Sequence, residues 1–454
     1  MFEFVNNSLL FNISLIIKHY LIGPPKPSWD LKFHQTWAMI KSLSENTSNM
    51  TIEQIQSASF RPYPTPAGVM INEFKINNKY RHEAQVHLNK ILKPYEHVLD
   101  PEWKNLKDDG INAEWVHVPN DGWEKREIRK TILYLHGGGY YLCNKDSSRN
   151  VTGSLAKWTN TRVLAIDYRL APQYPFPAAL QDALAAYLYL LNPPKDTGFE
   201  PLNPKNIVIA GDSAGGGLSL ALGLAIRDAG LPSCAGISCW SPWVDLTHGT
   251  PSILDDECVD FIPKFKGSNV THAESQVLNE YKEKTAALTE KIKKQNLGNL
   301  PPLLLVAGDE IIYLAHRSAE PTKYKGPSYN AGKFEKSPFQ TPTNTTLEIY
   351  EEMTHVFQTL EHPSTTKSYE RKSEFINRVI NSPNEPLPPS SYNCINVKGE
   401  FNHLKEHHKK VLNWEEIGIV PSITRNEFNS TSHRLTPKLL ISIGIVSVLA
   451  YVLY

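Results

Sequence analysis

The sequence predicts an α/β fold in which a mostly parallel sheet is covered by helices on both faces. From about residue 111 onward, short apolar runs alternate with longer helical stretches. The apolar runs are almost uninterrupted, which is typical of strands buried on both faces of a parallel sheet. With 454 residues, 41% of them hydrophobic, the chain is long enough to bury such a core.

Each expected element can be placed along the chain. We expect strands at 113–119, 130–137, 162–168, 206–212, 234–242, 302–309 and 345–353, and helices at 154–160, 176–191, 215–230 and 368–380. Val, Ile and Leu are frequent in the strand segments, and Gly, Pro and Asn bound them. Helices between successive strands are the connections that parallel strands require.

Composition divides the rest of the chain into flanking regions. A Pro-interrupted region of helical patterns, which we expect to form a cap or lid, follows an apolar start, and a polar tail leads to an apolar end. A charged helical insertion at 272–298 and a Pro/Gly-rich loop at 326–344 interrupt the α/β region. The expected boundaries are 1–24 for the apolar start, 25–110 for the helical cap, 111–382 for the α/β domain, 383–436 for the polar tail and 437–454 for the apolar end.

Charge and cysteine content argue against several classes of protein. Lys plus Arg and Asp plus Glu both number 47, so the chain has no basic footprint for nucleic acid. The five cysteines include no CxxC pair, which disfavours a disulfide scaffold or a cysteine-ligated metal. His403 and His407 are spaced like two ligands on one helix face, but their densely charged surroundings favour a solvated helix. We expect no metal and no organic cofactor.

The segment Gly211-Asp212-Ser213-Ala214-Gly215 falls between an expected strand and an expected helix. In this context a G-x-S-x-G sequence forms a strained turn that exposes the serine hydroxyl, and its glycines leave room for the strand and helix to cross closely. The alternative is an ordinary Gly/Ser-rich turn that caps the helix. Ser213 is therefore a candidate nucleophile.

A second glycine-rich motif, His136-Gly137-Gly138-Gly139, ends another expected strand. Such glycines let the backbone approach a reacting carbonyl group and direct N–H groups at its developing oxyanion. We expect Gly137, Gly138 and Ala214 to provide these donors, and His136 to hold the loop rather than act as a base. The alternative is a turn without a catalytic role.

The serine needs a general base, which should lie late in the chain. Proteins that carry a G-x-S-x-G turn of this kind order their catalytic residues as serine, acid and then histidine. His355, in LEIYEEMTHVFQ, follows the last expected strand and begins a turn that leads into a helix. It is the candidate base.

From about Ile132 to Ile380 the chain resembles the hormone-sensitive-lipase-like α/β-hydrolases, a family that includes arylacetamide deacetylase. Besides the two glycine-rich motifs, DYRLAPQYPFPAALQDALAAY, SPWVDLT and HVFQ occur in the family's order. GPPKPSW near the N-terminus and EIIYLAH resemble a fungal branch related to steryl acetyl hydrolase. The resemblance implies an α/β-hydrolase fold and hydrolysis of a carboxylic ester through an acyl-enzyme on Ser213.

The resemblance also implies a small apolar ester as the substrate, such as the acetyl ester of a sterol. A rival from another class is a non-catalytic or impaired ligand-binding protein on the same fold, as among plant hormone receptors that resemble this family, because a fold does not determine function. Hydrolysis of an amide or peptide bond by the same residues is a third hypothesis. Nothing in the sequence indicates an oligomeric state.

The carboxylate that would orient His355 has three candidates. In the fungal relatives the strand that ends in VAGDEIIYLAH continues through a longer turn, whose first glutamate resembles the acid, and much of that turn is missing here. Asp309 follows the strand directly and is the preferred candidate, Glu310 is the next residue, and Asp245 in SPWVDLT lies at a neighbouring strand end. Alternatively, Asp309 only caps the following helix and the acid is absent.

One end of the chain or the other is expected to associate with a membrane. Residues 9–23 are mostly apolar but are interrupted by Asn12, Lys18 and His19, which suits an interfacial segment. As a helix the uncharged run 439–454 would reach roughly 24 Å, short of a hydrocarbon core of ~30 Å, and it indicates a marginal tail anchor. The resemblance implies the endoplasmic reticulum membrane, with the domain in the lumen and membrane lipid as a partner. If the C-terminal run is the anchor instead, Arg434 and Lys438 before it favour a cytosolic domain.

Overall fold

The structure, a computed structural model, describes residues 2–404 apart from 46–51, 61, 120–129, 196, 198, 245–258, 261, 263–296, 307–308, 322–337 and 383–384. In this part of the chain one sheet has the strand order β1-β2-β4-β3-β5-β6-β7-β8-β9-β10. The pairs from β4 to β9 are parallel, whereas β1–β2, β2–β4 and β9–β10 are antiparallel. The strands are β1 (Met70–Asn77), β2 (Gly110–His117), β3 (Thr131–Leu135), β4 (Arg162–Ile166), β5 (Ile207–Asp212), β6 (Gly236–Trp240), β7 (Leu303–Val306), β8 (Thr345–Tyr350), β9 (Ser391–Ile395) and β10 (Phe401–His403).

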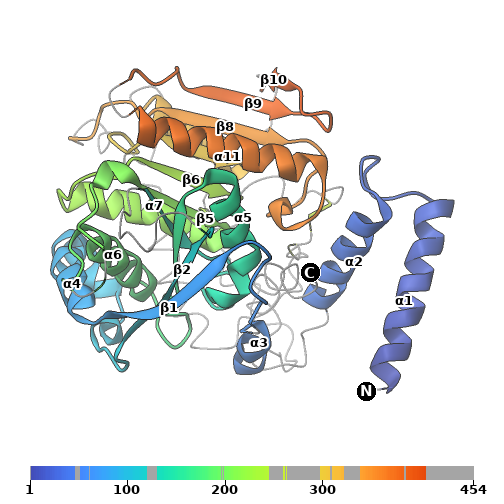
Figure 1. Ribbon diagram of the computed structural model, residues 1–454, viewed down its shortest axis with the longest axis horizontal. Coiled ribbons are helices and arrows are strands. Elements are labelled where there is room, and N and C mark those ends of the chain that lie inside the picture. Colours follow the sequence, from blue (N-terminus) through green and yellow to red (C-terminus); the bar gives the residue numbers. More distant parts are fainter. Residues whose placement is uncertain are drawn as a thin grey trace, which may run out of the picture.

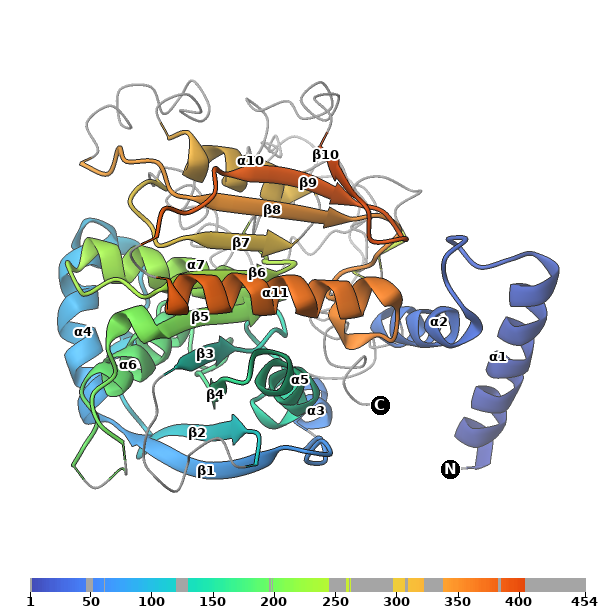
Figure 2. The ribbon, with the colours of Figure 1, turned by 45° about the horizontal axis from the view of Figure 1, so that its top comes forward.

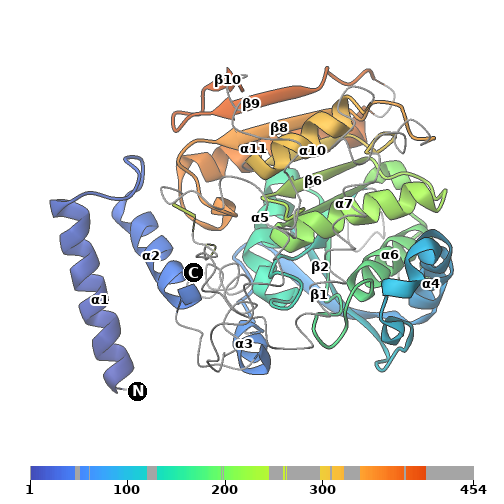
Figure 3. The ribbon, with the colours of Figure 1, turned by 180° about the vertical axis from the view of Figure 1, so that it is seen from behind.

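Helices cover both faces of this sheet (Figure 1, Figure 2). α5 and α11 pack on one face, and α4, α6, α7 and α10 pack on the other, which Figure 3 shows from behind. α1 and α2 lie to one side of the sheet. The helices are α1 (Phe2–Leu21), α2 (Leu31–Glu45), α3 (Ile52–Ser59), α4 (Lys79–Leu92), α5 (Arg149–Thr159), α6 (Ala178–Leu191), α7 (Ser213–Asp228), α10 (Asp309–Ala319) and α11 (Pro363–Asn381).

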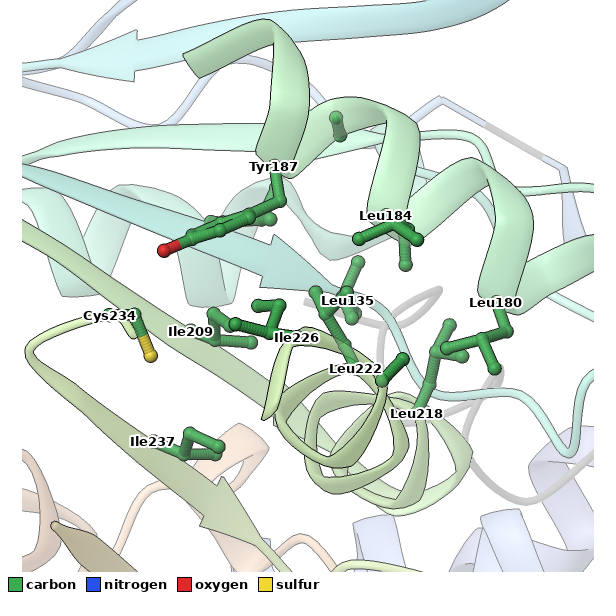
Figure 4. Packing of buried hydrophobic residues seen from close by; sticks show 14 of the residues in the cluster. Leu135, Leu180, Leu184, Tyr187, Ile209, Leu218, Leu222, Ile226, Cys234 and Ile237 are labelled. Atoms are coloured by element: carbon green, nitrogen blue, oxygen red, sulfur yellow. The ribbon is translucent and has the colours of Figure 1, made fainter. Parts of the chain in front are cut away.

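The strands contribute to two hydrophobic cores because successive side chains point to opposite faces. In β3, Leu135 belongs to the core beneath α6 and α7, whereas its neighbour Tyr134 belongs to the core beneath α5 and α11. Figure 4 shows the first core, where Leu184 of α6 and Leu222 of α7 pack near Leu135. All four side chains are 0% exposed. Full burial of such a side chain contributes about 1.5–3 kcal/mol, so the central strands are held firmly from both sides.

The seven expected strands correspond to β2 through β8, and the four expected helices to α5, α6, α7 and α11, so the expected α/β architecture is confirmed. Two expectations about the flanking regions are wrong. β1 lies within 25–110, where the sequence predicts only helices, and β9 and β10 lie within 383–436, where it predicts a tail. These are strands at the two margins of the sheet, where exposed polar side chains are tolerated and the apolar alternation is weak.

Several sequence expectations fall outside the described residues. The insertion at 272–298 is described only at its last two residues, and the loop at 326–344 only from residue 338. The apolar end at 437–454 is also outside. Their roles as a lid, a flexible loop and an anchor therefore stay predictions.

Candidate active site

Ser213 lies at the turn where β5 ends and α7 begins, at the carboxyl edge of the parallel strands. Its φ of 50° is in the left-handed region, which is strained for a residue with a side chain. Gly215 makes this turn possible, because a Cβ atom there would overlap the carbonyl oxygen of Leu135. The strained turn presents the Ser213 hydroxyl, as the G-x-S-x-G motif predicts.

His355 lies on the loop between β8 and the short 3₁₀ helix η8 (Phe357–Thr359). Its Nε2 is 2.9 Å from Oγ of Ser213, so the structure brings together the nucleophile and the base that the sequence indicates. The loop is held where it meets β6, because the N–H of Val356 donates to Oγ of Ser241 at 3.0 Å. Ser241 in turn donates its own N–H to the carbonyl oxygen of Val306 at 2.6 Å.

Burial sets the protonation state of His355. Desolvation lowers the pKa of its imidazole, and the negative charge of Asp260 acts in the opposite direction. The net shift is downward, so the imidazole is neutral at pH 7 and its Nε2 is able to accept a proton. A general base beside a serine hydroxyl needs this state.

His136 is fixed within the protein rather than placed for proton transfer. It is 1% exposed, stacks on Tyr168 with ring centroids 4.2 Å apart, and has Nδ1 2.7 Å from the carbonyl oxygen of Gly137. Burial lowers its pKa to about 4, so its ring is neutral. The hydroxyl of Tyr168 donates to the carbonyl oxygen of His136 at 2.6 Å. These contacts hold the glycine-rich loop.

The structure corrects the expected set of oxyanion donors. The N–H of Gly137 donates to Oδ1 of Asp212 at 3.1 Å and so is already used. By contrast, the N–H groups of Gly138 and Gly139 reach no acceptor among the residues that the structure describes. Ala214 is in the first turn of α7, where N–H groups have no partner within the helix. The available donors are therefore Gly138, Gly139 and Ala214.

Asp212 joins the nucleophile turn to this loop. Besides the N–H of Gly137, its carboxylate accepts a hydrogen bond from the hydroxyl of Tyr134, and it is completely buried. Burial raises the pKa of Asp212 to about 6, although these two donors and the nearby charge of Lys372 oppose the shift. Asp212, the residue before Ser213, thus anchors the oxyanion loop to the nucleophile turn.

The three expected acids cannot be placed. Asp309 begins α10, but the side chains of Asp309 and Glu310, and the whole of Asp245, lie outside the described part of the chain. A different carboxylate lies at the site, because Oδ1 of Asp260 accepts the backbone N–H of His355 at 3.3 Å. No sequence pattern indicates Asp260, because it belongs to no motif and has no characteristic spacing.

One group of carboxylates elsewhere has the geometry of a cation site. Oxygens of Glu73, Glu114 and Asp146 lie within 4.8 Å of one another. However, Lys145 contacts Glu73 at 3.2 Å and Glu114 at 3.4 Å, and Arg149 contacts Glu114 at 2.7 Å. Two basic side chains already offset most of this charge, so the group is an ion-pair network.

The role of Asp212 predicts a difference between two substitutions. Asp212→Ala should lower kcat for ester hydrolysis about tenfold or more with little change in KM, because the loop that carries the oxyanion donors loses its anchor. Asp212→Asn should retain most of kcat, because its amide oxygen still accepts the hydrogen bonds from Gly137 and Tyr134. Steady-state kinetics on a short-chain p-nitrophenyl ester would measure both. Wild-type kcat in Asp212→Ala would contradict the anchoring role.

Comparisons with known proteins support the same fold. A family model described as alpha/beta hydrolase fold matches residues 132–321. An acetyl-hydrolase of Streptomyces hygroscopicus is 43% identical over 134 residues, 30% of this chain and 40% of that protein. An esterase of Acinetobacter venetianus is 28% identical over 185 residues, which cover 40% of this chain and 57% of that protein. The chain thus spans less than two thirds of the length of either relative.

Solved structures extend the similarity to more of the chain. A crystal structure of an esterase from the bacterial hormone-sensitive lipase (HSL) family has 25% sequence identity and a TM-score of 0.53, and the match covers 78% of this chain and 99% of that one. The esterase EstE5, in crystals soaked with ethyl alcohol, also has 25% identity and a TM-score of 0.53, over 76% of this chain and 99% of its own. The chain therefore has the α/β-hydrolase fold.

Proposed function

We propose that this chain is a serine carboxylester hydrolase. The observation that carries the proposal is the 2.9 Å contact between Oγ of Ser213 and Nε2 of His355. Ser213 is on a strained turn, and the N–H groups of Gly138 and Gly139 have no acceptor in the part of the chain that the structure describes. Nucleophile, base and oxyanion donors together are the parts that acyl transfer requires.

The proposed reaction has two halves. Oγ of Ser213 attacks the carbonyl carbon of the ester while its proton passes to Nε2 of His355, and N–H groups of Gly138, Gly139 and Ala214 stabilise the oxyanion. The tetrahedral intermediate collapses to an acyl-serine as His355 returns the proton to the departing alcohol. Water then attacks the acyl group with His355 as base, and the acid is released.

We propose an apolar ester with a small acyl group, such as a steryl acetate, as the substrate. The Streptomyces relative is named an acetyl-hydrolase, which supports a short acyl group. Two partly exposed aromatic side chains, Tyr140 and Trp243, have ring centroids 5.9 Å apart. The backbone N–H of Trp243 donates to the carbonyl oxygen of Ser213 at 2.8 Å, so this aromatic pair is next to the nucleophile. Aromatic surface of this kind favours apolar groups.

The catalytic proposal predicts that Ser213 and His355 act as a unit. Ser213→Ala and His355→Ala should each lower kcat/KM for a short-chain p-nitrophenyl ester by at least about 10³-fold, and the double variant should be little worse than either, because both take part in the same proton transfer. Equal thermal denaturation midpoints would show that the variants are folded. If Ser213→Ala keeps more than a tenth of the activity, Ser213 is not the nucleophile and the assignment is wrong.

We also propose that α1 lies in a membrane interface. Its exposed apolar side chains include Leu10, Ile13, Ile17 and Leu21, whereas His19 on another side of the helix contacts His34 of α2. Within the described residues no helix meets the length and hydropathy needed to cross a bilayer, whereas an interfacial helix needs only one apolar face. The endoplasmic reticulum is the proposed location, and fractionation of a tagged chain to another compartment would contradict it.

A vesicle experiment tests the role of α1. The double variant Ile17→Asp with Leu21→Asp should bind phosphatidylcholine vesicles on the order of tenfold more weakly than wild type in a co-sedimentation assay, because two charges oppose insertion of the apolar face. Val86→Asp is a matched control, because Val86 is an exposed apolar residue on α4, 70% exposed and distant in the sequence. Equal binding by the double variant and wild type would rule out α1 as the membrane contact.

A further inference from the structure

We propose that Asp260 is the carboxylate that positions His355, and that Trp37 of α2 holds Asp260 in place. The inference rests on the proposed function and adds two positioning residues to that site. Asp260 precedes His355 by 95 positions and accepts the backbone N–H of His355 on Oδ1 at 3.3 Å. This contact restrains the backbone from which the imidazole projects toward Ser213.

The charge of Asp260 also acts on the reacting ring. Among the residues that the structure describes, it is the ionised group whose field raises the pKa of His355, against the lowering by burial. Other charged groups near the site have different contacts. Asp212 is bonded to Tyr134 and Gly137, and Glu352 accepts the N–H of Ser28 at 3.0 Å. Asp260 is therefore placed to stabilise the imidazolium that forms when Ser213 attacks.

The buried side chain of Lys372 on α11 also has contacts of its own. Its Nζ lies 3.5 Å from the ring centroid of Trp240 and donates to the carbonyl oxygen of Ser238 at 3.2 Å. Burial lowers the pKa of Lys372 to about 7, and its charge acts on Asp212 and Cys239.

The segment that carries Asp260 is fastened to the N-terminal region. The indole N–H of Trp37 donates to the carbonyl oxygen of Val259 at 2.7 Å, across 222 positions of sequence. Val259 and Ile262 pack against an apolar cluster of Trp29, Phe33, Ile40 and Leu360. The N–H of Ile262 reaches Oδ1 of Asp260 at 3.4 Å. Anchors on both sides therefore fix the carboxylate between them.

The same apolar cluster holds the histidine loop. Leu360 belongs to it and Met353 packs against it, so the cluster contacts the loop on both sides of His355. The indole N–H of Trp29 donates to the carbonyl oxygen of Glu352 at 2.8 Å. In Figures 1 and 2, α2 lies beside the loop between β8 and α11. The N-terminal region thus positions both the base and the carboxylate.

The test compares pH profiles of the full chain. Hydrolysis of a short-chain p-nitrophenyl ester needs neutral His355. The fall of kcat/KM toward low pH, the acid limb of the profile, therefore reports the pKa of that imidazole. Asp260→Asn removes the charge that raises this pKa, and the limb should move to lower pH. The same substitution should lower kcat by about 10²-fold, because the imidazolium is less stabilised. Asp260→Glu, which restores the carboxylate, should recover most of kcat and return the limb toward its wild-type position.

Trp37→Phe tests the second residue. It keeps an aromatic ring in the cluster but removes the N–H that holds Val259, so kcat should fall several-fold and the limb should move in the same direction as in Asp260→Asn. Because the two residues act through one contact, the double variant should be little worse than Asp260→Asn alone. Lys32→Ala is a control on the same helix. It breaks an exposed ion pair with Glu361 and should leave the profile unchanged.

Four outcomes separate this proposal from its rivals. A shifted limb and lower kcat in Asp260→Asn, rescued in Asp260→Glu, support it. A loss of less than threefold with an unmoved limb overturns it. It is also overturned if Asp309→Asn or Glu310→Gln, rather than Asp260→Asn, produces the shift and the loss. If Asp260→Asn fails to fold, an unmoved acid limb together with wild-type kcat in Trp37→Phe overturns it. Failure of the proposed function would instead appear as full activity in Ser213→Ala.

Discussion

The turn at Ser213 is the constraint on which the rest of the site depends. The backbone reverses between β5 and α7 within one residue of left-handed conformation, and only a glycine at position 215 leaves room for the carbonyl oxygen of Leu135. The serine hydroxyl must then meet a histidine 142 positions later, with 2.9 Å between Oγ and Nε2. Parallel strands achieve this because their carboxyl ends lie at one edge of the sheet. Burial on both faces keeps that edge fixed.

Much of this arrangement follows from the sequence. Uninterrupted apolar runs predict the central strands because both of their faces are buried, and the G-x-S-x-G turn and a late histidine identify Ser213 and His355 as partners. β1 is harder to predict, because it lies at the edge of the sheet and most of its side chains are at least partly exposed, so it has no uninterrupted apolar run. A run of glycines also does not show which way each backbone N–H points. The sequence therefore assigns Gly137 to the oxyanion, whereas its N–H donates to Asp212.

The position of Asp260 near His355 could not be predicted from the sequence. It is a single aspartate in a stretch with no motif, and its nearness to His355 depends on packing that is distant in sequence. Trp37 and Val259 are held together by one hydrogen bond and an apolar cluster. Local sequence patterns do not predict such a contact, because neither segment carries a motif that points to the other. The shortened turn at Asp309 draws attention to the end of β7, and nothing in the sequence directs attention to Asp260, which accepts the N–H of His355.

These contacts show that the N-terminal region packs against the segments around the site. The sequence suggests a cap joined to a finished catalytic domain, yet Trp29 and Trp37 bond to segments that flank the base and a carboxylate. α1 packs on α2 and exposes apolar side chains on its other side. Through α2, one continuous set of contacts therefore links the proposed membrane-facing helix to the histidine loop. The geometry of the base depends on a part of the chain that the α/β fold alone does not require.

The most direct test of the central claim is covalent labelling of the full chain with a serine-directed fluorophosphonate, followed by peptide mapping. A nucleophilic serine paired with a neutral imidazole should react once, on Ser213, and Ser213→Ala should remain unlabelled. His355→Ala should label much more slowly, because the hydroxyl loses its base. Absence of labelling in the wild-type chain would contradict the account and favour a ligand-binding protein on this fold. Equal labelling in Ser213→Ala would contradict it by showing that the reactive residue is not Ser213.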